Sequence, residues 1–261
     1  MSDADPQKGE RVAKVIARSG YCSRREAEVL IAQRRVDIDG ETVIQPGTTV
    51  MRGQKVTIDG EALPAVEAAR LFRFHKPAGV LTAARDPEGR PLFGDLLPEG
   101  LPRLMPVGRL DMTSEGLLLL TNDGGLKRHL ELPATGWLRR YRVRVYGQVR
   151  AEQLSSLEKG LTIDGERFGP IRASLDRVQG HNAWMTVALR EGKNREVRRV
   201  CQHLGLTVNR LIRVSYGPFQ LGALREGAVE EVPAKALREQ LGRFLPAATE
   251  KKEPRRAPGR R

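Results

Sequence analysis

The chain has few of the residues that build disulfide frameworks or metal sites. Its 261 residues include only two cysteines, Cys22 and Cys201, which lie far apart and form no Cys-x-x-Cys pair, and its four histidines are scattered. This pattern argues against a disulfide framework and provides no ligand spacing for zinc. We therefore expect no metal ion and a cytoplasmic location.

Long hydrophobic runs are also missing. No apolar stretch approaches the roughly 20 residues of a membrane-spanning helix, and the first residues, MSDADPQKGE, lack the apolar core of a signal peptide. The sequence has neither a phosphate-binding P-loop nor a dinucleotide fingerprint. We expect no membrane partner and no nucleotide cofactor.

Acidic residues are too few to balance the basic ones. The 45 Lys and Arg outnumber the 32 Asp and Glu, which gives a net charge of +13. Residues 1–70 are neutral, so the surplus lies in residues 71–249 and in a basic tail after them. A surplus of this kind indicates a polyanionic partner, most commonly nucleic acid, although a solvated basic surface is the alternative.

Two short helices are predicted near the N-terminus. Residues 10–20 have apolar side chains at helical spacing, and Gly20 is a suitable end. Ser23-Arg24-Arg25-Glu26 has the pattern of a capping box and predicts a second helix through about Arg34. The basic side chains on and just after these helices are Lys14, Arg18, Arg24, Arg25, Arg34 and Arg35. Their clustering suits a phosphate backbone, and a solvated helix face is the alternative.

Short alternating runs follow the two helices. Asp-Gly pairs at 39–40 and 59–60 predict tight hairpin turns of a small sheet, and a third pair stands at 164–165. Residues 62–69 are small and apolar with one proline, which is typical of a linker.

The most informative stretch is Gly108-Arg109-Leu110-Asp111-Met112-Thr113-Ser114-Glu115-Gly116, which four leucines follow. Leu117 to Leu120 predict a strand buried on both faces. Asp111 at the entrance of that strand, with Arg109 beside it, is suited to be an ionised nucleophile or base. A carboxylate that merely serves a turn is the alternative.

Two further stretches hold candidate site residues. Residues 140–146 alternate strictly, so Tyr141 shares one strand face with valines and could stack on a base, or be an ordinary core residue. His75-Lys76-Pro77-Ala78-Gly79 predicts a sharp turn at which Lys76 could meet a phosphate, although a plain turn is the alternative.

Residues 191–205 predict a helix with a basic stripe. At helical spacing Arg195, Arg198 and Arg199 share one side, and Gly205 is a suitable end. Three guanidinium groups on one face need anions opposite, for which RNA phosphates and Asp111 are the candidates. A solvated basic face is the alternative.

Taken together, these motifs resemble two known families. Ser23–Glu28 followed by Arg35-Val36-Asp37-Ile38-Asp39-Gly40 resembles the S4 RNA-binding module. The Asp111 stretch, Tyr141 and Glu191-Gly-Lys-Asn-Arg-Glu-Val-Arg-Arg199 resemble the RsuA/RluB/RluE/RluF family of ribosomal RNA pseudouridine synthases, over residues 9–246. Residues 182–199 and 209–217 look most similar to the RluB members, which modify 23S rRNA near the peptidyl-transferase centre.

The resemblance implies an α+β fold in two parts. An S4 RNA-binding domain (9–61) and a linker (62–69) precede a pseudouridine synthase catalytic domain (70–246), which is built on a mixed, mostly antiparallel sheet with flanking helices. A disordered basic tail (247–261) follows. The short linker suggests a tethered S4 domain that swings to meet RNA. We expect the protein to be a monomer.

The resemblance also implies residue roles. Asp111 matches the essential aspartate, Tyr141 the tyrosine that stacks on the target base, Arg198 the partner of the carboxylate, and Leu211 the aliphatic residue beneath the tyrosine. Ser114 and Lys193 depart from the usual Thr and Arg but keep the donor type. The expected RNA contacts are Lys14, Arg18, Arg24, Arg25, Arg34, Arg35, Lys76, Arg109, Lys193, Arg195 and Arg199.

The implied reaction isomerises a uridine of 23S ribosomal RNA, bound within a ribosome assembly intermediate, to pseudouridine. Substrate and product are isomers, so no cofactor is needed. Three alternatives are a 16S small-subunit synthase, a non-catalytic assembly factor that contains S4, and a glycosidase, which needs a second carboxylate at the bond.

Overall fold

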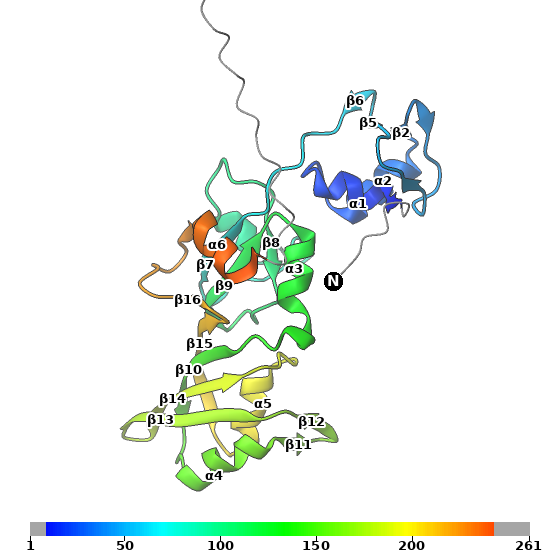
Figure 1. Ribbon diagram of the computed structural model, residues 1–261. Coiled ribbons are helices and arrows are strands. Elements are labelled where there is room, and N and C mark those ends of the chain that lie inside the picture. Colours follow the sequence, from blue (N-terminus) through cyan, green and yellow to red (C-terminus); the bar gives the residue numbers. More distant parts are fainter. Residues whose placement is uncertain (1–8, 243–261) are drawn as a thin grey trace, which may run out of the picture.

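A computed structural model describes residues 9–242 of the chain (Figure 1). The predicted tail (247–261) and the predicted end of the catalytic domain at residue 246 lie outside the described residues. Within them, no helix is long and apolar enough to cross a membrane.

The N-terminal part consists of two helices and a small sheet, as predicted. Helix α1 (Val12–Arg18) packs on α2 (Arg24–Ala32), and Ser23 and Glu26 form the expected reciprocal capping box. Helix α2 ends at Ala32, two residues earlier than predicted, and Arg34 has a φ of 58° that no helix accommodates. The strands are β1 (Glu10–Arg11), which pairs with β4 (Thr49–Val50), and a sheet in the order β3 (Glu41–Thr42), β2 (Val36–Ile38), β5 (Val56–Ile58) and β6 (Glu61–Ala62).

The three Asp-Gly pairs form tight hairpin turns, which confirms the prediction. Asp39 and Gly40 have φ values of 53° and 88°, and the pairs at 59–60 and 164–165 are alike. Positive φ at both central residues is the type I′ geometry that matches the strand twist. The turns join β2 to β3, β5 to β6, and β11 (Leu161–Ile163) to β12 (Glu166–Phe168).

The larger part is built on a nine-stranded sheet, in which the only parallel pair joins β15 to β9. The mixed, mostly antiparallel sheet is therefore confirmed. Its main path runs through β13 (Ile171–Gln179), β14 (Asn182–Leu189), β10 (Arg139–Tyr146), β15 (Thr207–Tyr216), β9 (Glu115–Thr121), β7 (Leu71–Lys76) and β17 (Val229–Glu231), while β16 (Phe219–Gln220) pairs with β15 and β8 (Met105–Val107) with β9. The helices of this part are α3 (Gly124–Glu131), α4 (Ala151–Ser156), α5 (Glu196–His203) and α6 (Ala234–Leu241), and short 3₁₀ turns lie at Phe93–Leu96, Pro133–Thr135 and Leu157–Lys159.

Strand β9 lies at the centre of the core. Leu117 to Leu120 have no exposed surface, so the predicted strand buried on both faces is confirmed. Leu118 and Leu120 join one core cluster, which includes side chains of α4 and α5, whereas Leu117 and Leu119 join a second cluster with α3 and α6. A strand packed on both faces fixes the position of the Asp111 loop that enters it.

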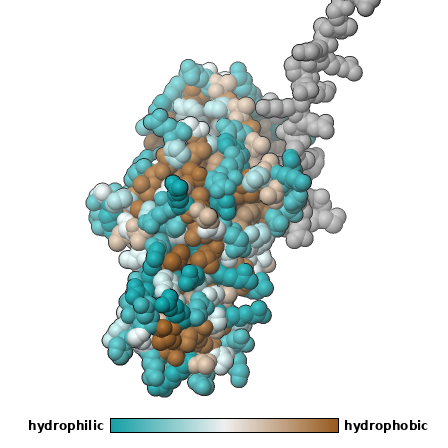
Figure 2. Space-filling view, turned by 90° about the vertical axis from the view of Figure 1, so that its left-hand side faces the viewer, coloured by the Kyte–Doolittle hydropathy of each residue, from teal (hydrophilic) through white to brown (hydrophobic). Residues whose placement is uncertain are grey.

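The outside of the molecule is mixed in polarity. Figure 2 shows hydrophobic residues gathered in several separate patches with hydrophilic residues around them. Strand β10 illustrates the pattern, because Tyr141, Val143 and Val145 are buried whereas the arginines between them are exposed, as their alternation predicts.

Candidate active site

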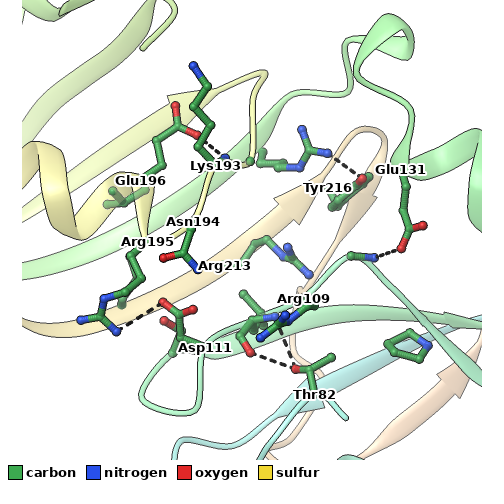
Figure 3. A pocket seen from close by; sticks show the side chains of 18 of the residues that line it. Thr82, Arg109, Asp111, Glu131, Lys193, Asn194, Arg195, Glu196, Arg213 and Tyr216 are labelled. Atoms are coloured by element: carbon green, nitrogen blue, oxygen red, sulfur yellow. Dashed lines mark hydrogen bonds and ion pairs between the residues drawn. The ribbon is translucent and has the colours of Figure 1, made fainter. Parts of the chain in front are cut away.

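The predicted site residues from β10, β15 and the Asp111 loop meet around one cleft of about 920 Å³. Its lining includes Asp111, Tyr141, Arg195, Leu211 and Arg213 (Figure 3). Helix α2 of the N-terminal part also contributes one residue to the lining, Arg25. The cleft therefore combines segments that are far apart in the sequence.

Asp111 lies in the loop before β9, with 29% of its side chain exposed. Its Oδ2 is 3.8 Å from Nη1 of Arg195 (Figure 3). The amide of Ser114 donates a hydrogen bond to the Asp111 carbonyl at 3.0 Å. The amide of Gly79 donates to the Met112 carbonyl at 2.8 Å. The carboxylate is thus open to the cleft while its backbone is fixed.

Lys76 is placed differently from the prediction. We expected it to meet a phosphate, but its side chain is fully buried, and its Nζ donates to the carbonyls of Pro77 and Ser114, each at 2.8 Å, and of Met112 at 3.4 Å. Burial lowers the pKa of Lys76 to about 8, against the opposing charges of Asp111 and Glu115. Lys76 supports the Asp111 loop from beneath.

Two further side chains fix the start of the loop. Thr82 Oγ1 donates to the Leu110 carbonyl at 2.9 Å, and the Gly108 amide donates to a Glu131 carboxylate oxygen at 2.6 Å (Figure 3). Both act on main-chain atoms, so the loop shape does not depend on the side chain of Asp111.

The arginine partner of Asp111 is not the one that the resemblance implied. Arg195 makes the ion pair, whereas Arg198 donates to the carbonyls of Thr113 at 3.0 Å and Val208 at 3.3 Å. Burial and the neighbouring Arg195 lower the pKa of Arg198, and the charge of Asp111 opposes this. Arg198 therefore lies near the carboxylate but bonds the backbone beside it.

The predicted stripe of three arginines does not form. Helix α5 begins at Glu196, and Arg195 precedes it in the left-handed conformation, with a φ of 49°. Arg199 forms an ion pair with Glu166, and its guanidinium lies 4.8 Å from the centre of the Phe168 ring. The three side chains consequently serve three different partners. The end of the helix agrees with the prediction, since Gly205 has a φ of 74°.

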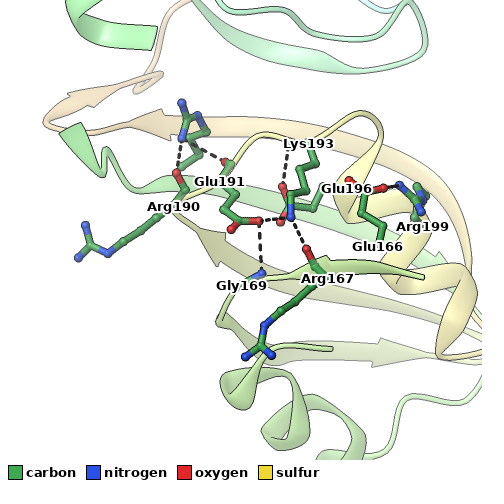
Figure 4. A network of polar contacts seen from close by, with 9 residues as sticks. Glu166, Arg167, Gly169, Arg190, Glu191, Lys193, Glu196 and Arg199 are labelled. Carbon is green, nitrogen blue, oxygen red and sulfur yellow. Dashed lines mark hydrogen bonds and ion pairs between the residues drawn. The ribbon is translucent and has the colours of Figure 1, made fainter. Parts of the chain in front are cut away.

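Lys193 also has protein partners. Its Nζ lies 3.2 Å from Glu191 and donates to the Arg167 carbonyl, and its amide donates to Glu196 at 2.9 Å (Figure 4). Lys193 and Arg199 thus belong to a polar network around β12 and the start of α5. Lys193 also lines the cleft, so its RNA contact stays a prediction, as does that of Arg199.

Tyr141 and Leu211 lie on adjacent strands. Tyr141 is 8% exposed and Leu211 is 5% exposed, and both line the cleft and join the same core cluster. In the pairing of β10 with β15, Leu211 is opposite Val143. Val143 is two residues after Tyr141 and lies on the same face of β10. This placement gives Tyr141 an apolar support.

Sequence reasoning missed three cleft residues with buried or hydrogen-bonded side chains. Arg213 is 2% exposed and donates from Nε to the Leu117 carbonyl at 2.7 Å. Arg139 donates to the Tyr216 hydroxyl at 2.8 Å, and that hydroxyl donates to the Leu130 carbonyl at 2.7 Å. Of these three residues, Arg213 is directly opposite Tyr141 in the pairing of β10 with β15, which no local sequence pattern indicates.

The remaining predicted RNA contacts fall into two groups. Lys14 and Arg18 both pair with Glu10 at 2.6 Å, and Arg35 pairs with Asp59. The predicted RNA contacts of the second group are exposed and form no ion pair within residues 9–242; they are Arg24, Arg25, Arg34 and Arg109. Of the second group, Arg25 and Arg109 line the cleft.

Comparison with known families assigns both parts of the chain. Residues 70–203 match the RNA pseudouridylate synthase family, and residues 10–56 match the S4 domain. A crystal structure of a pseudouridylate synthase superposes with a TM-score of 0.62 and 26% identity, covering 87% of this chain and 98% of that one.

Curated proteins extend the similarity over most of the chain. An RNA pseudouridine synthase of Rickettsia prowazekii is 43% identical over 232 residues, 88% of this chain and 97% of the relative. Ribosomal large subunit pseudouridine synthase B of Yersinia pestis is 39% identical, over 87% of this chain and 74% of the relative. The same enzyme of Haemophilus influenzae is 40% identical, over 96% and 72%.

The fold, the cleft and these matches agree. The chain belongs to the RNA pseudouridylate synthase family, and its S4 domain and relatives make it a member of the RsuA/RluB type. It is an RNA-binding isomerase that converts uridine to pseudouridine.

Proposed function

We propose that this synthase modifies one specific uridine of 23S ribosomal RNA, bound in a ribosome assembly intermediate, and that Asp111 is its catalytic residue. The observation that carries the catalytic proposal is the cleft itself, in which a partly exposed carboxylate on a fixed loop meets Arg195 in a lining that includes Tyr141. The large-subunit target is supported by relatives named ribosomal large subunit pseudouridine synthase B.

Before reaction the target uridine leaves its stack in the RNA. This costs a few kcal/mol, which contacts to the flanking backbone must offset. Arg25 and Arg109 at the cleft are suited to those contacts, because both are exposed and free of ion pairs within the described residues. Tyr141 stacks on the extruded base, and Leu211 supports it from the neighbouring strand.

Asp111 then acts on the ribose, as a nucleophile at C1′ or as a base at C2′. The N1–C1′ bond breaks, the uracil rotates, and a C5–C1′ bond forms. The C5 proton is lost and N1 gains one, so atoms and electrons balance without a cofactor. Both routes use the Asp111 carboxylate, whose Oδ2 lies 3.8 Å from Nη1 of Arg195.

The test is mapping of pseudouridine across both ribosomal RNAs in cells with and without the gene. The proposal expects one signal in 23S rRNA to disappear and to return with the wild-type gene. A loss in 16S rRNA alone would instead identify a small-subunit synthase, and no loss in either RNA would contradict a ribosomal target. Normal function of an Asp111→Ala strain would indicate an assembly role without catalysis.

A further inference from the structure

Strand β10 has a second face that the reaction does not use. Tyr141 points to the cleft, whereas Arg140, Arg142, Arg144 and Tyr146 point to the opposite side of the sheet and are exposed. We call this side of β13, β14, β10 and β15 the outer face. The alternation of the strand places it away from the catalytic carboxylate.

The neighbouring strands add more arginines to the outer face. Side chains directly opposite each other in paired strands lie on the same face. Arg144 is opposite Arg210 of β15 and Trp184 of β14, and Arg177 of β13 is also opposite Trp184. The arginines of the outer face are Arg140, Arg142, Arg144, Arg172, Arg177 and Arg210.

This positive charge is poorly balanced by protein groups. Arg210 pairs with Glu115, but the other five arginines form no ion pair within residues 9–242. Asp176, at a bulge of β13, accepts a hydrogen bond from Thr186, which is opposite Arg142. Arg144 and Arg210 are directly opposite each other, and like charges in that position destabilise a sheet, so an external anion would stabilise this face.

Aromatic and amide groups stand among the arginines. The guanidinium of Arg142 lies 4.8 Å from the centre of a Trp184 ring. Tyr146 is 52% exposed, and its ring is 5.9 Å from that of His181. The exposed ring of Tyr146 is suited to stacking with a base, while the arginines meet phosphates.

Helices leave this part of the sheet open. Core side chains of α4 and α5 pack on the inner face with Val143 and Met185, and α3 and α6 cover the sheet around β7 and β9 (Figure 1). The outer face carries charged and polar side chains where a covering helix would need apolar ones. Its chemistry therefore fits a polyanion and not a protein helix.

We propose that the outer face is a second RNA-binding surface, which holds a segment of the substrate RNA other than the one that carries the target uridine. The arginines bind its phosphates, and Tyr146 stacks on an unpaired base. The proposal rests on the RNA substrate of the enzyme, and it does not depend on which ribosomal RNA that is. The enzyme would then bind a large structured RNA at two separate surfaces, the cleft and the outer face.

The first test uses the double variant Arg142→Gln/Arg144→Gln of the full chain. The logarithm of the binding constant falls linearly with the logarithm of the salt concentration. Each lost phosphate contact makes this slope shallower by about 0.7 to 0.9. We expect the slope for a long ribosomal RNA fragment to fall by about 1.4 to 1.8, with several-fold weaker binding, while kcat on a short stem-loop stays unchanged. The matched control, Lys235→Gln/Arg238→Gln, removes two exposed charges from α6 and should keep the wild-type slope.

The second test is a direct probe of contact. The chain has two tryptophans, so Trp137→Phe leaves Trp184 as the fluorescent reporter on the outer face. Binding of the long fragment should quench this fluorescence, and the short stem-loop should not. Unchanged fluorescence at saturating long RNA, or a double variant with the salt slope of the control, would overturn the proposal.

Failure of this proposal is distinguishable from failure of the proposed function. The double variant is titrated with fragments of both ribosomal RNAs. If the target lies in the other ribosomal RNA, a different fragment binds tightly. The effect of the outer-face variant on the salt dependence of binding can still be measured with that fragment. Loss of the outer-face effect alone leaves the pseudouridine map unchanged.

Discussion

At the scale of single residues, one side chain contacts the carboxylate of Asp111, and other side chains hold the backbone of its loop. Arg195 reaches the carboxylate, whereas Arg198, Lys76, Thr82 and Glu131 all bond main-chain atoms around it. A carboxylate held through its backbone keeps its place when substrate binds, which is the preorganisation that catalysis needs.

Replacing Arg195 and replacing Arg198 should consequently have different effects on stability and activity. Arg195→Gln removes a partly exposed ion pair worth up to about 1 kcal/mol, so the free energy of unfolding should change little and kcat should fall about fivefold. Arg198→Gln removes charged hydrogen bonds to two carbonyls and should cost about 1.5 to 3 kcal/mol of stability as well as activity. Thermal denaturation and single-turnover kinetics of both variants decide this, and equal destabilisation would contradict it.

Lys76 should make stability depend on pH in the alkaline range. Its folded pKa of about 8 lies below the ordinary 10.5, so the unfolded chain binds more protons between these values. The contribution of Lys76 to the free energy of unfolding therefore rises with pH from about 8 to 10.5, by at most about 1.4 kcal/mol per pH unit. Urea denaturation at pH 7.5 and 9.5 measures it.

The variant Lys76→Met is the reference for that measurement. It leaves the three carbonyls without their donor and should be less stable by about 1 to 3 kcal/mol. Subtracting its pH dependence isolates the lysine. A difference between wild type and variant that shrinks from pH 7.5 to 9.5 would contradict the assignment.

At the scale of elements, the sequence predicts the features that depend on neighbouring residues and does not predict those that depend on distant contacts. The leucine strand, the capping box and the Asp-Gly turns depend on residues within a few positions, and all three are present. Lys76 was misread because distant carbonyls of the Asp111 loop bury it. The prediction for Arg195 is wrong because the helix begins at Glu196 and not at residue 191, so that Arg195 precedes it with a left-handed backbone. Arg213 was missed because only the sheet register brings it opposite Tyr141.

The join between β9 and β15 depends on one glycine. Gly116 has a φ of 101°, and a Cβ there would lie 2.4 Å from the Arg213 carbonyl oxygen and 2.8 Å from the Arg213 nitrogen. Gly116→Ala should therefore destabilise the protein by about 3 kcal/mol or more. Gly124→Ala at the start of α3, where nothing lies within 4 Å of the added Cβ, is the control and should be neutral or slightly stabilising. Equal melting temperatures of the two variants would refute the packing argument.

At the scale of the whole molecule, the S4 domain contributes to the lining of the candidate cleft. Arg25 of α2 lines it, and the next residue, Glu26, pairs with Arg85 of the catalytic part at 2.6 Å. The sequence suggested a tethered module that swings to meet RNA. In the structure one end of α2 lies at the cleft, and whether the module also swings stays a prediction.

Arg25→Gln should thus affect catalysis more than an ordinary surface arginine does. We expect KM for an RNA substrate to rise several-fold, because a positive charge at the cleft is lost. Arg52→Gln, in an exposed loop of the same domain and free of ion pairs within the described residues, is the matched control. Steady-state kinetics on one stem-loop compare them, and identical KM values would place Arg25 outside the substrate site.

The most direct measurement is release of tritium from ribosomal RNA labelled at C5 of uridine, with purified wild-type protein and Asp111→Asn. Formation of the C5–C1′ bond expels the C5 proton, so each turnover releases one label. The wild-type protein should release label in proportion to pseudouridine formed, whereas Asp111→Asn should release none while binding the RNA with nearly unchanged affinity. Substantial release by Asp111→Asn would contradict the catalytic role of this carboxylate.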